Sequence, residues 1–231
     1  MIRPYRPADD PGLSNVCIRT GAAGEDATDQ YADPSVLPAI FALPYAHLEP
    51  SLAFVVEDLG GVEDSGVEDS GGVEDSGGVE DLGGVVGYVL GTADTATFAR
   101  RFRQEWLPRV ADRYPQADGG RADGGRAEDE PGLDAVMVDI LHHPERMVVP
   151  ALAAWPAHLH IDLLPAYQRR GLGRQLIETF LAALREAGVR AVHLGVATRN
   201  VKARAFYDRL GFEVIDVPDV SENLTYLGLR F

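Results

Sequence analysis

Residues 160–188 read HIDLLPAYQRRGLGRQLIETFLAALREAG. Apolar and polar residues alternate through Leu159, Ile161 and Leu163, as in a half-buried strand, and Pro165 ends that strand because it has no N–H for a ladder. Further on, apolar side chains recur at spacings of three and four and share one helix face: Leu176, Ile177, Phe180, Leu181 and Leu184. The pattern predicts a strand, a tight turn and a long amphipathic helix.

The turn between these two elements, QRRGLG at residues 168–173, predicts an anion site. The first N–H groups of a helix have no partner within it and lie at the positive end of its dipole. Gly171 and Gly173 let a phosphate approach the main chain without a Cβ in the way. Three arginines add positive charge around the turn: Arg169, Arg170 and Arg174. A glycine-containing helix start with arginines in solvent explains the turn alone equally well, because a short glycine pattern is a weak motif.

Two motifs in order favour the anion site. Gln168, Gly171 and Gly173 follow the pattern Gln/Arg-x-x-Gly-x-Gly/Ala. Residues 199–215 then present an Asn, an Ala three positions on, and a Tyr before Leu-Gly-Phe: Asn200, Ala203, Tyr207, Leu210, Gly211 and Phe212. Together they resemble the pyrophosphate loop and the downstream motif of the GNAT family of acyl-CoA-dependent N-acetyltransferases. Two motifs at the right spacing are more specific than either alone.

This resemblance implies an α/β (α+β) fold of the GNAT type, with a mixed central sheet, helices on both faces and a splayed pair of strands at the cofactor site. It implies acetyl-CoA (coenzyme A) as the cofactor. The cofactor-binding residues that it implies are Leu163, Leu164, Gln168, Arg169, Arg170, Gly171, Leu172, Gly173, Arg174, Asn200 and Tyr207. Residues 32–58, 87–95 and 160–165 also resemble the acetyltransferase-like C-terminal domain of eukaryotic O-GlcNAcases, which lacks the pyrophosphate loop that is kept here.

Acetyl transfer from a thioester to an amine needs a base, a donor for the oxyanion and an acid for the leaving thiolate. The resemblance implies that the N–H of Leu163 faces the thioester carbonyl and that Tyr207 protonates the sulfur. The alternative for Tyr207 is a core aromatic, although Phe206 and Leu210 already form an apolar pair beside it. Asn200 matches a family residue that hydrogen-bonds the cofactor, and it also suits the N-cap of the following helix.

Two acidic residues are further catalytic candidates. Asp162 alternates with Ile161 and Leu163, so it points away from the apolar face of its strand and is a candidate base. A carboxylate in that role needs a raised pKa or a water relay, and a structural ion pair is an equal alternative. Asp94 ends a strand and is a candidate to bind a cationic acceptor, but capping of the next helix is favoured.

The remaining periodicity predicts the element order β-α-α-β-β-α-(α)-β-α-β-α-β-β, a mixed sheet with helices on both faces. Asp10 is expected to cap a helix that ends near Gly21, and one helix is expected over residues 95–113. Residues 212–217 and 224–229 are expected to form the last strands. By the resemblance, the polar residues 24–31 lie over the acceptor site.

Most of the net negative charge of the chain comes from one segment. Its formal net charge is −15, which argues against a nucleic-acid partner, but ten acids lie in a five-fold repeat at residues 56–84, and without those ten acids the charge becomes −5. The repeat spacing fits neither an EF-hand nor a nonapeptide calcium motif, so low complexity favours disorder. We therefore expect a single domain over residues 1–231, with inserts at 58–84 and 117–132.

Other function classes are disfavoured. Cys17 is the only cysteine, so no internal disulfide can form, and it is expected to pack in the core. No apolar run approaches the ~20 residues of a membrane span, and no signal peptide is evident, so a cytoplasmic location and no membrane partner are expected. Four histidines lie at no recognised metal spacing and are interpreted as structural, with no metal expected: His142, His143, His158 and His160.

The sequence therefore predicts an acetyl-CoA-dependent N-acetyltransferase that works by direct attack in a ternary complex. The expected acceptor is a small-molecule amine, an aminosugar or a peptide amine, and homodimerisation is left open. The alternative from another class is a non-catalytic module that binds CoA or another protein.

Overall fold

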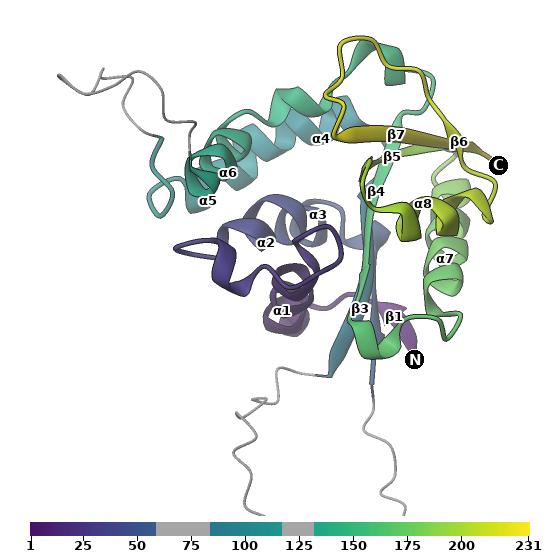
Figure 1. Cartoon of the computed structure of the whole chain (residues 1–231), viewed down its shortest axis with the longest axis horizontal. Helices are drawn as coiled ribbons and strands as arrows, with labels where there is room; N and C mark the ends of the chain where they lie inside the picture. Colours follow the sequence, from purple (N-terminus) through teal and green to yellow (C-terminus); the bar gives the residue numbers. More distant parts are fainter. Residues whose placement is uncertain (59–83, 117–131) are drawn as a thin grey trace, which may run out of the picture.

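The computed structural model describes residues 1–58, 84–116 and 132–231. Within these ranges the strands form one seven-stranded sheet in the order β1-β2-β3-β4-β5-β7-β6 (Figure 1). The strands are β1 (Ile2–Pro4), β2 (Ala53–Glu57), β3 (Val85–Thr92), β4 (Ala157–Leu163), β5 (Ala191–Ala197), β6 (Glu213–Val214) and β7 (Leu224–Arg230). The β4–β5 pair is parallel and the other neighbouring pairs are antiparallel, so the sheet is mixed as expected.

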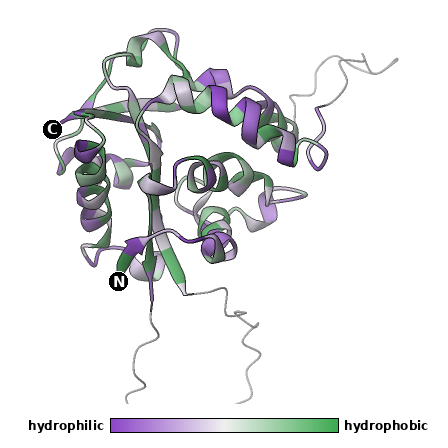
Figure 2. Cartoon of the chain, turned by 180° about the vertical axis from the view of Figure 1, so that it is seen from behind, coloured by the Kyte–Doolittle hydropathy of each residue, from purple (hydrophilic) through white to green (hydrophobic). Residues whose placement is uncertain are grey.

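Helices cover both faces of this sheet, and Figure 1 shows α7 and α8 on the side opposite to α1–α6. The helices are α1 (Asp10–Thr20), α2 (Val36–Phe41), α3 (Leu43–Leu48), α4 (Thr95–Arg101), α5 (Leu107–Val110), α6 (Leu133–His142), α7 (Leu172–Glu186) and α8 (Val201–Asp208). In Figure 2, α7 carries both hydrophobic and hydrophilic residues, and all five predicted apolar positions on it are buried. No helix in the described ranges has the length and apolar character needed to cross a bilayer.

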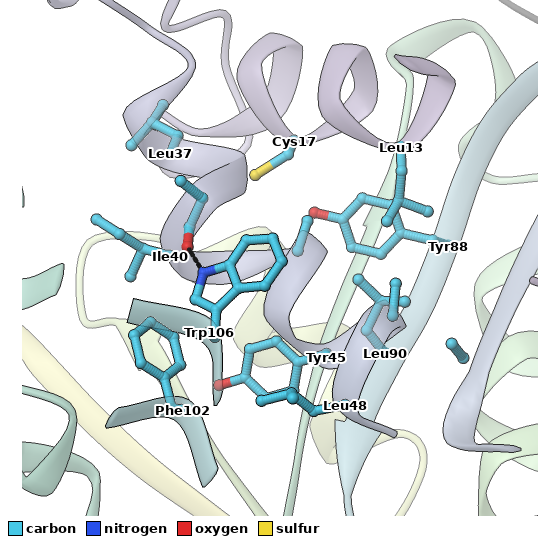
Figure 3. Close-up of a cluster of buried hydrophobic side chains, with 14 of the residues drawn as sticks. Leu13, Cys17, Leu37, Ile40, Tyr45, Leu48, Tyr88, Leu90, Phe102 and Trp106 are labelled. Atoms are coloured by element: carbon cyan, nitrogen blue, oxygen red, sulfur yellow. Dashed lines mark hydrogen bonds between the residues drawn. The ribbon is translucent and has the colours of Figure 1, made fainter. Parts of the chain in front are cut away.

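Two hydrophobic clusters pack on the two faces of the sheet. Figure 3 shows the cluster under α1–α3, where Tyr45, Tyr88 and Trp106 pack together with Cys17, which is only 4% exposed. The indole N–H of Trp106 donates to the carbonyl of Ala39 at 2.8 Å, so this polar group is satisfied inside the core. The second cluster lies under α7.

Two sequence-based expectations about helices are wrong in detail. Asp10 does not cap α1 but is its first residue, because its carboxylate accepts a hydrogen bond from the Tyr5 hydroxyl at 2.5 Å and pairs with His47 at 2.8 Å. The helix expected over residues 95–113 consists of α4, a π-helical segment at Phe102–Trp106, and α5. In this segment Phe102 and Trp106 are both buried in the core.

The strand expected at residues 212–217 is limited to the two residues of β6. It is the edge strand and pairs with β7 alone, and its flanking apolar residues turn into two different clusters, with Phe212 under α7 and Val217 beside Leu152. Beyond β6 the N–H of Ile215 still donates to the carbonyl of Tyr226 at 2.9 Å, after which the chain packs beside Leu152 instead of extending the strand.

The expected inserts at 58–84 and 117–132 lie outside the described residues except for their ends. At the ends of the first, Glu57 pairs with Val85, and the N–H of Asp58 donates to the carbonyl of Gly84 at 2.7 Å. β2 and β3 are therefore direct antiparallel neighbours in the sheet.

Candidate active site

The turn before α7 leaves the start of this helix open. Gly171 is the N-cap and has φ +82°, a left-handed conformation that glycine adopts without a Cβ penalty. No side chain among the described residues caps the helix. A Cβ on Gly173 would lie 3.2 Å from Cζ of Phe206, so the absence of a side chain also lets α7 pack closely on α8. The first N–H groups of α7 are thus available to an anion.

Gln168 connects this turn to the sheet by a hydrogen bond. Its side-chain amide donates to the carbonyl of Leu163, the last residue of β4, at 2.9 Å. The arginines of the turn are exposed to solvent, and Arg170 lies over the ring of Tyr167 at 5.3 Å while Arg174 is 3.7 Å from Glu178. Such exposed interactions are weak, so both cations are able to turn toward a bound phosphate.

β4 and β5 splay apart beside this turn. They pair only through Ala157 with Val192 and His158 with His193, and no later residue of β4 is paired with β5. The edge of β4 after His158 is therefore open on the β5 side, as the expected pair of splayed strands requires.

The N–H of Leu163 faces this opening. The next residue, Leu164, donates its N–H to the carbonyl of Val86 at 3.0 Å, which makes Leu163 and Gly87 a non-hydrogen-bonded pair of the β3–β4 ladder. The N–H and C=O of Leu163 must then point away from β3. Leu164 has no free N–H to offer and contributes its half-buried side chain to both clusters.

Tyr207 is the buried residue of α8. It is 8% exposed and packs edge-on against Phe206 and Phe212, whereas Phe206 and Leu210 are only partly buried. Phe206 and Leu210 do pack against the cluster under α7, but the expectation that Tyr207 sits beside this apolar pair and not within the packing is wrong. The Tyr207 hydroxyl makes no hydrogen bond to any described residue, and burial, followed by the charge of Asp162, raises its pKa above the ordinary value.

Asn200 caps α8 as the capping alternative predicts. Its Oδ1 accepts the N–H of Ala203 at 3.0 Å, and its Nδ2 donates to the carbonyl of Ala23 at 2.9 Å. This residue therefore ties the start of α8 to the loop after α1. A cofactor contact by Asn200 would use its remaining N–H and lone pair.

Asp162 lies on the face of β4 that is covered by α1–α3. Its Oδ2 accepts a 2.7 Å hydrogen bond from the hydroxyl of Tyr88, which stands opposite it on β3. Burial raises the pKa of Asp162 to about 6, although the bond from Tyr88 favours the ionised form. A carboxylate with this pKa is a better base near neutral pH than an exposed one.

Asp94 is not brought together with Asp162 and Tyr207. It is exposed at the far end of β3, beyond Thr92, which pairs with His158 rather than with the Asp162 end of β4. Its Oδ1 accepts the N–H of Thr97 at 2.7 Å and caps α4. The capping alternative of the sequence analysis is the role that the geometry supports.

Two strand histidines converge on one tyrosine that the sequence did not single out. The Tyr45 hydroxyl lies 2.8 Å from Nε2 of His158 and 3.1 Å from Nε2 of His160. Burial lowers the pKa of both histidines, to about 4 for His160, so both are neutral at pH 7. No group of His, Cys, Asp and Glu within residues 1–58, 84–116 and 132–231 is arranged to hold a metal ion.

An acyl-transfer site needs a donor for the oxyanion, an anion site for the cofactor and an acid, and the uncovered strand edge, the open helix start and the buried phenol could serve these needs. The sequence model of the Acetyltransferase (GNAT) family matches residues 142–212, which include β4, the turn, α7, β5 and α8. The chain belongs to this family, whose fold it shares. Family membership makes acetyl-CoA its cofactor.

The chain is also similar to individual proteins. The solved structure of SsHAT is 48% identical with a TM-score of 0.80, over 100% of this chain and 97% of that one. Protein O-GlcNAcase of Rattus norvegicus is 24% identical over 230 residues, which is 98% of this chain but only 22% of that protein. Ribosomal protein bS18-alanine N-acetyltransferase of Escherichia coli K12 is 46% identical over 53 residues, 23% of this chain and 36% of that enzyme.

Proposed function

We propose that this protein is an N-acetyltransferase in which an amine acceptor attacks the acetyl thioester directly, within a ternary complex with acetyl-CoA. The observation that carries the proposal is the opening between β4 and β5 next to the uncapped start of α7. Such an opening admits a thioester to the interior of the sheet, while its diphosphate stays at the helix terminus.

The residues of the turn fit the diphosphate of the cofactor. Gly171 and Gly173 leave the main chain accessible, and the helix N–H groups point outward beside exposed arginines. When bound, acetyl-CoA supplies the acetyl group as a thioester and a thiol as the leaving group. Stabilisation of the oxyanion and the two proton transfers must then come from the side chains and main chain around the opening.

Three groups of this chain match the three needs of the reaction. The N–H of Leu163 donates to the carbonyl oxygen on which negative charge develops. The hydroxyl of Tyr207 donates a proton to the departing sulfur, and its raised pKa keeps it protonated beforehand. Asp162, held by Tyr88, takes the proton of the amine directly or through a water molecule.

The non-catalytic alternative is less well supported. A CoA-binding module has no use for a tyrosine hydroxyl that makes no hydrogen bond to any described residue, whereas an acyltransferase uses such a hydroxyl as a proton donor. The match to an acetyltransferase family includes the stretch with Tyr207 and Asp162.

Calorimetry with acetyl-CoA, followed by a thiol-release assay over a panel of amines, tests the proposal. We expect binding, and amine-dependent thiol release. Gly171→Ala should weaken acetyl-CoA binding about tenfold, or about 1.4 kcal/mol, because a Cβ would stand where the phosphate approaches. Gly188→Ala is the matched control, since Gly188 has φ +79° at the other end of α7 and nothing within 4 Å of its Cβ position.

Both variants carry a similar backbone strain, so only the difference between them reports on the turn. Equal acetyl-CoA affinities of the two variants would mean that the diphosphate does not bind at this turn. Binding without thiol release from any amine would favour the non-catalytic module, and absence of binding would reject both.

The pH dependence of turnover should report on Asp162. Because the pKa of this carboxyl is raised to about 6, we expect a plot of log kcat/KM against pH to be one unit steeper below about pH 6 than above it. The extra slope should disappear in Asp162→Asn, whose amide oxygen can still accept the hydrogen bond from Tyr88. Asp94→Asn, a carboxylate-to-amide change far from the opening, should keep the wild-type profile.

Stability supplies an independent check on the same group. The pKa of Asp162 is higher in the folded protein than its ordinary 3.8, so the folded state binds more protons than the unfolded state between pH 3.8 and about 6. The contribution of Asp162 to stability should therefore fall as pH rises through that window, and Asp162→Asn should lack this fall. A normal pKa by titration of the Asp162 carboxyl would contradict both expectations.

A further inference from the structure

Arg146 is a cation without an acidic partner in the described part of the chain. Its Nε donates a long hydrogen bond of 3.4 Å to the carbonyl of Ile140, and it takes part in no ion pair and no stacking on an aromatic ring. Of the acids nearest to it in sequence, Glu145 pairs with Arg103, and Asp139 pairs with His143 and acts on Arg146 only as a charge at a distance. The guanidinium therefore keeps most of its donors free for an anion.

The chain at Arg146 lies against the cluster of Tyr45 and His160, because Sδ of the next residue, Met147, accepts a hydrogen bond from the Tyr45 hydroxyl at 3.6 Å. Burial lowers the pKa of Arg146, and its charge acts on residues of three separate elements: Tyr45 of α3, His160 of β4 and Tyr226 of β7. The side chain is nevertheless exposed to solvent. The guanidinium is therefore reachable from solvent and lies close to these three elements.

The face of β5 beside Tyr226 is bare. Gly195, in the middle of the sheet, is exposed, although the residues on either side of it are buried. A Cβ on Gly195 would lie 3.1 Å from Cδ1 of Leu224 and 3.6 Å from Cε1 of Tyr226. Glycine inside a strand often marks the place where a ligand approaches the backbone.

Gly195 lies on the same sheet face as Asp162. The parallel pairing of His158 with His193 sets their side chains on one face, and steps of two residues lead from them to His160 and Asp162 on β4 and to Gly195 on β5. His160 and Asp162 are about 7 Å apart along the strand. This face thus continues the acceptor side of the opening, and because His160 is neutral at pH 7, Arg146 supplies positive charge beside it.

We propose that Arg146 binds an anionic group of the acceptor, so that the substrate is an amine that also carries a carboxylate or a phosphate several atoms from its nitrogen. This inference rests on the proposed acetyltransferase function. The amine would lie near Asp162, the connecting atoms over Gly195 beside Tyr226, and the anion against the guanidinium. Charge-assisted bonds from arginine to such anions are among the stronger polar contacts in proteins.

Matched pairs of amines test this assignment. 5-Aminopentanoate is compared with pentylamine, and 5-aminopentyl phosphate with 5-aminopentanol, so that the two pairs separate a carboxylate site from a phosphate site. For at least one pair the wild type should show a kcat/KM at least tenfold higher for the anionic member. This ratio should fall toward one in Arg146→Ala and be largely kept in Arg146→Lys. Arg109→Ala, which removes an exposed arginine that lies over Trp106, should leave the ratio unchanged.

A binding measurement separates failure of this inference from failure of the proposed function. The N-acetylated products of the same four amines are titrated by calorimetry into the wild type and Arg146→Ala, which requires no turnover. Preference of the wild type for an anionic product, lost in Arg146→Ala, supports the anion site even if no thiol is released. Equal binding of charged and neutral products, absence of binding by all four, or a preference that persists in Arg146→Ala, overturns it.

Discussion

Tyr207→Phe should lower the rate of amine-dependent thiol release by about 10²–10⁴-fold, which is the usual range for the loss of a general acid. The change removes one hydroxyl that makes no hydrogen bond to any described residue, so the packing against Phe206 and Phe212 should persist. Acetyl-CoA affinity should therefore change little while kcat falls. Steady-state kinetics of thiol release, together with calorimetry on the same preparation, measures both quantities.

Tyr114→Phe is the matched control for this variant. It also deletes a tyrosine hydroxyl, one that donates to Asp33 at 3.1 Å in the helical layer on the other side of the sheet. We expect it to cost about 1 kcal/mol of stability without changing turnover. Undiminished thiol release in Tyr207→Phe would reject this tyrosine as the proton donor and leave water as the acid. Loss of acetyl-CoA binding in the same variant would instead indicate a role in holding the cofactor.

The fold could be predicted where its determinants are local. The alternation through Leu159, Ile161 and Leu163 and the apolar stripe of α7 are set by the strand and helix repeats, and both elements occur where the patterns predict them. The glycines could be interpreted as a turn for the same reason, because the φ of +82° at Gly171 is a conformation that a single glycine adopts by itself. Local patterns therefore predicted the strand-turn-helix unit on which the site is built.

Other parts of the candidate site depend on contacts between residues that are distant in sequence, and local sequence patterns do not predict such contacts. Tyr88 meets Asp162 across 74 positions of sequence, and Tyr45 meets His158 across 113. The deeper burial of Tyr207 than of Phe206 follows from how α8 is rotated against the sheet, which periodicity over eight residues does not determine. Sequence patterns could therefore name Asp162 and Tyr207 but could not show what holds them.

Gly91→Ala should lower the free energy of unfolding by about 3 kcal/mol, the upper end of the usual cost of overpacking a core. A Cβ at this position of β3 would lie 2.3 Å from the carbonyl oxygen of His158 and 2.5 Å from Cζ of Phe180. The first contact is with backbone and the second with a fully buried ring, so neither neighbour can move without displacing β4 or α7. Urea unfolding followed by circular dichroism measures the loss.

Gly132→Ala is the control for this change, because nothing lies within 4 Å of the added methyl group and we expect a change of less than about 0.5 kcal/mol. His158 is the last residue of β4 that pairs with β5, so the strand that Gly91→Ala displaces is the one from which the opening begins. The variant should therefore lose thiol release even under conditions in which it remains folded. Equal stabilities of the two variants would mean that β3 and β4 can separate freely, and the geometry of the opening would then not be set by close packing at Gly91.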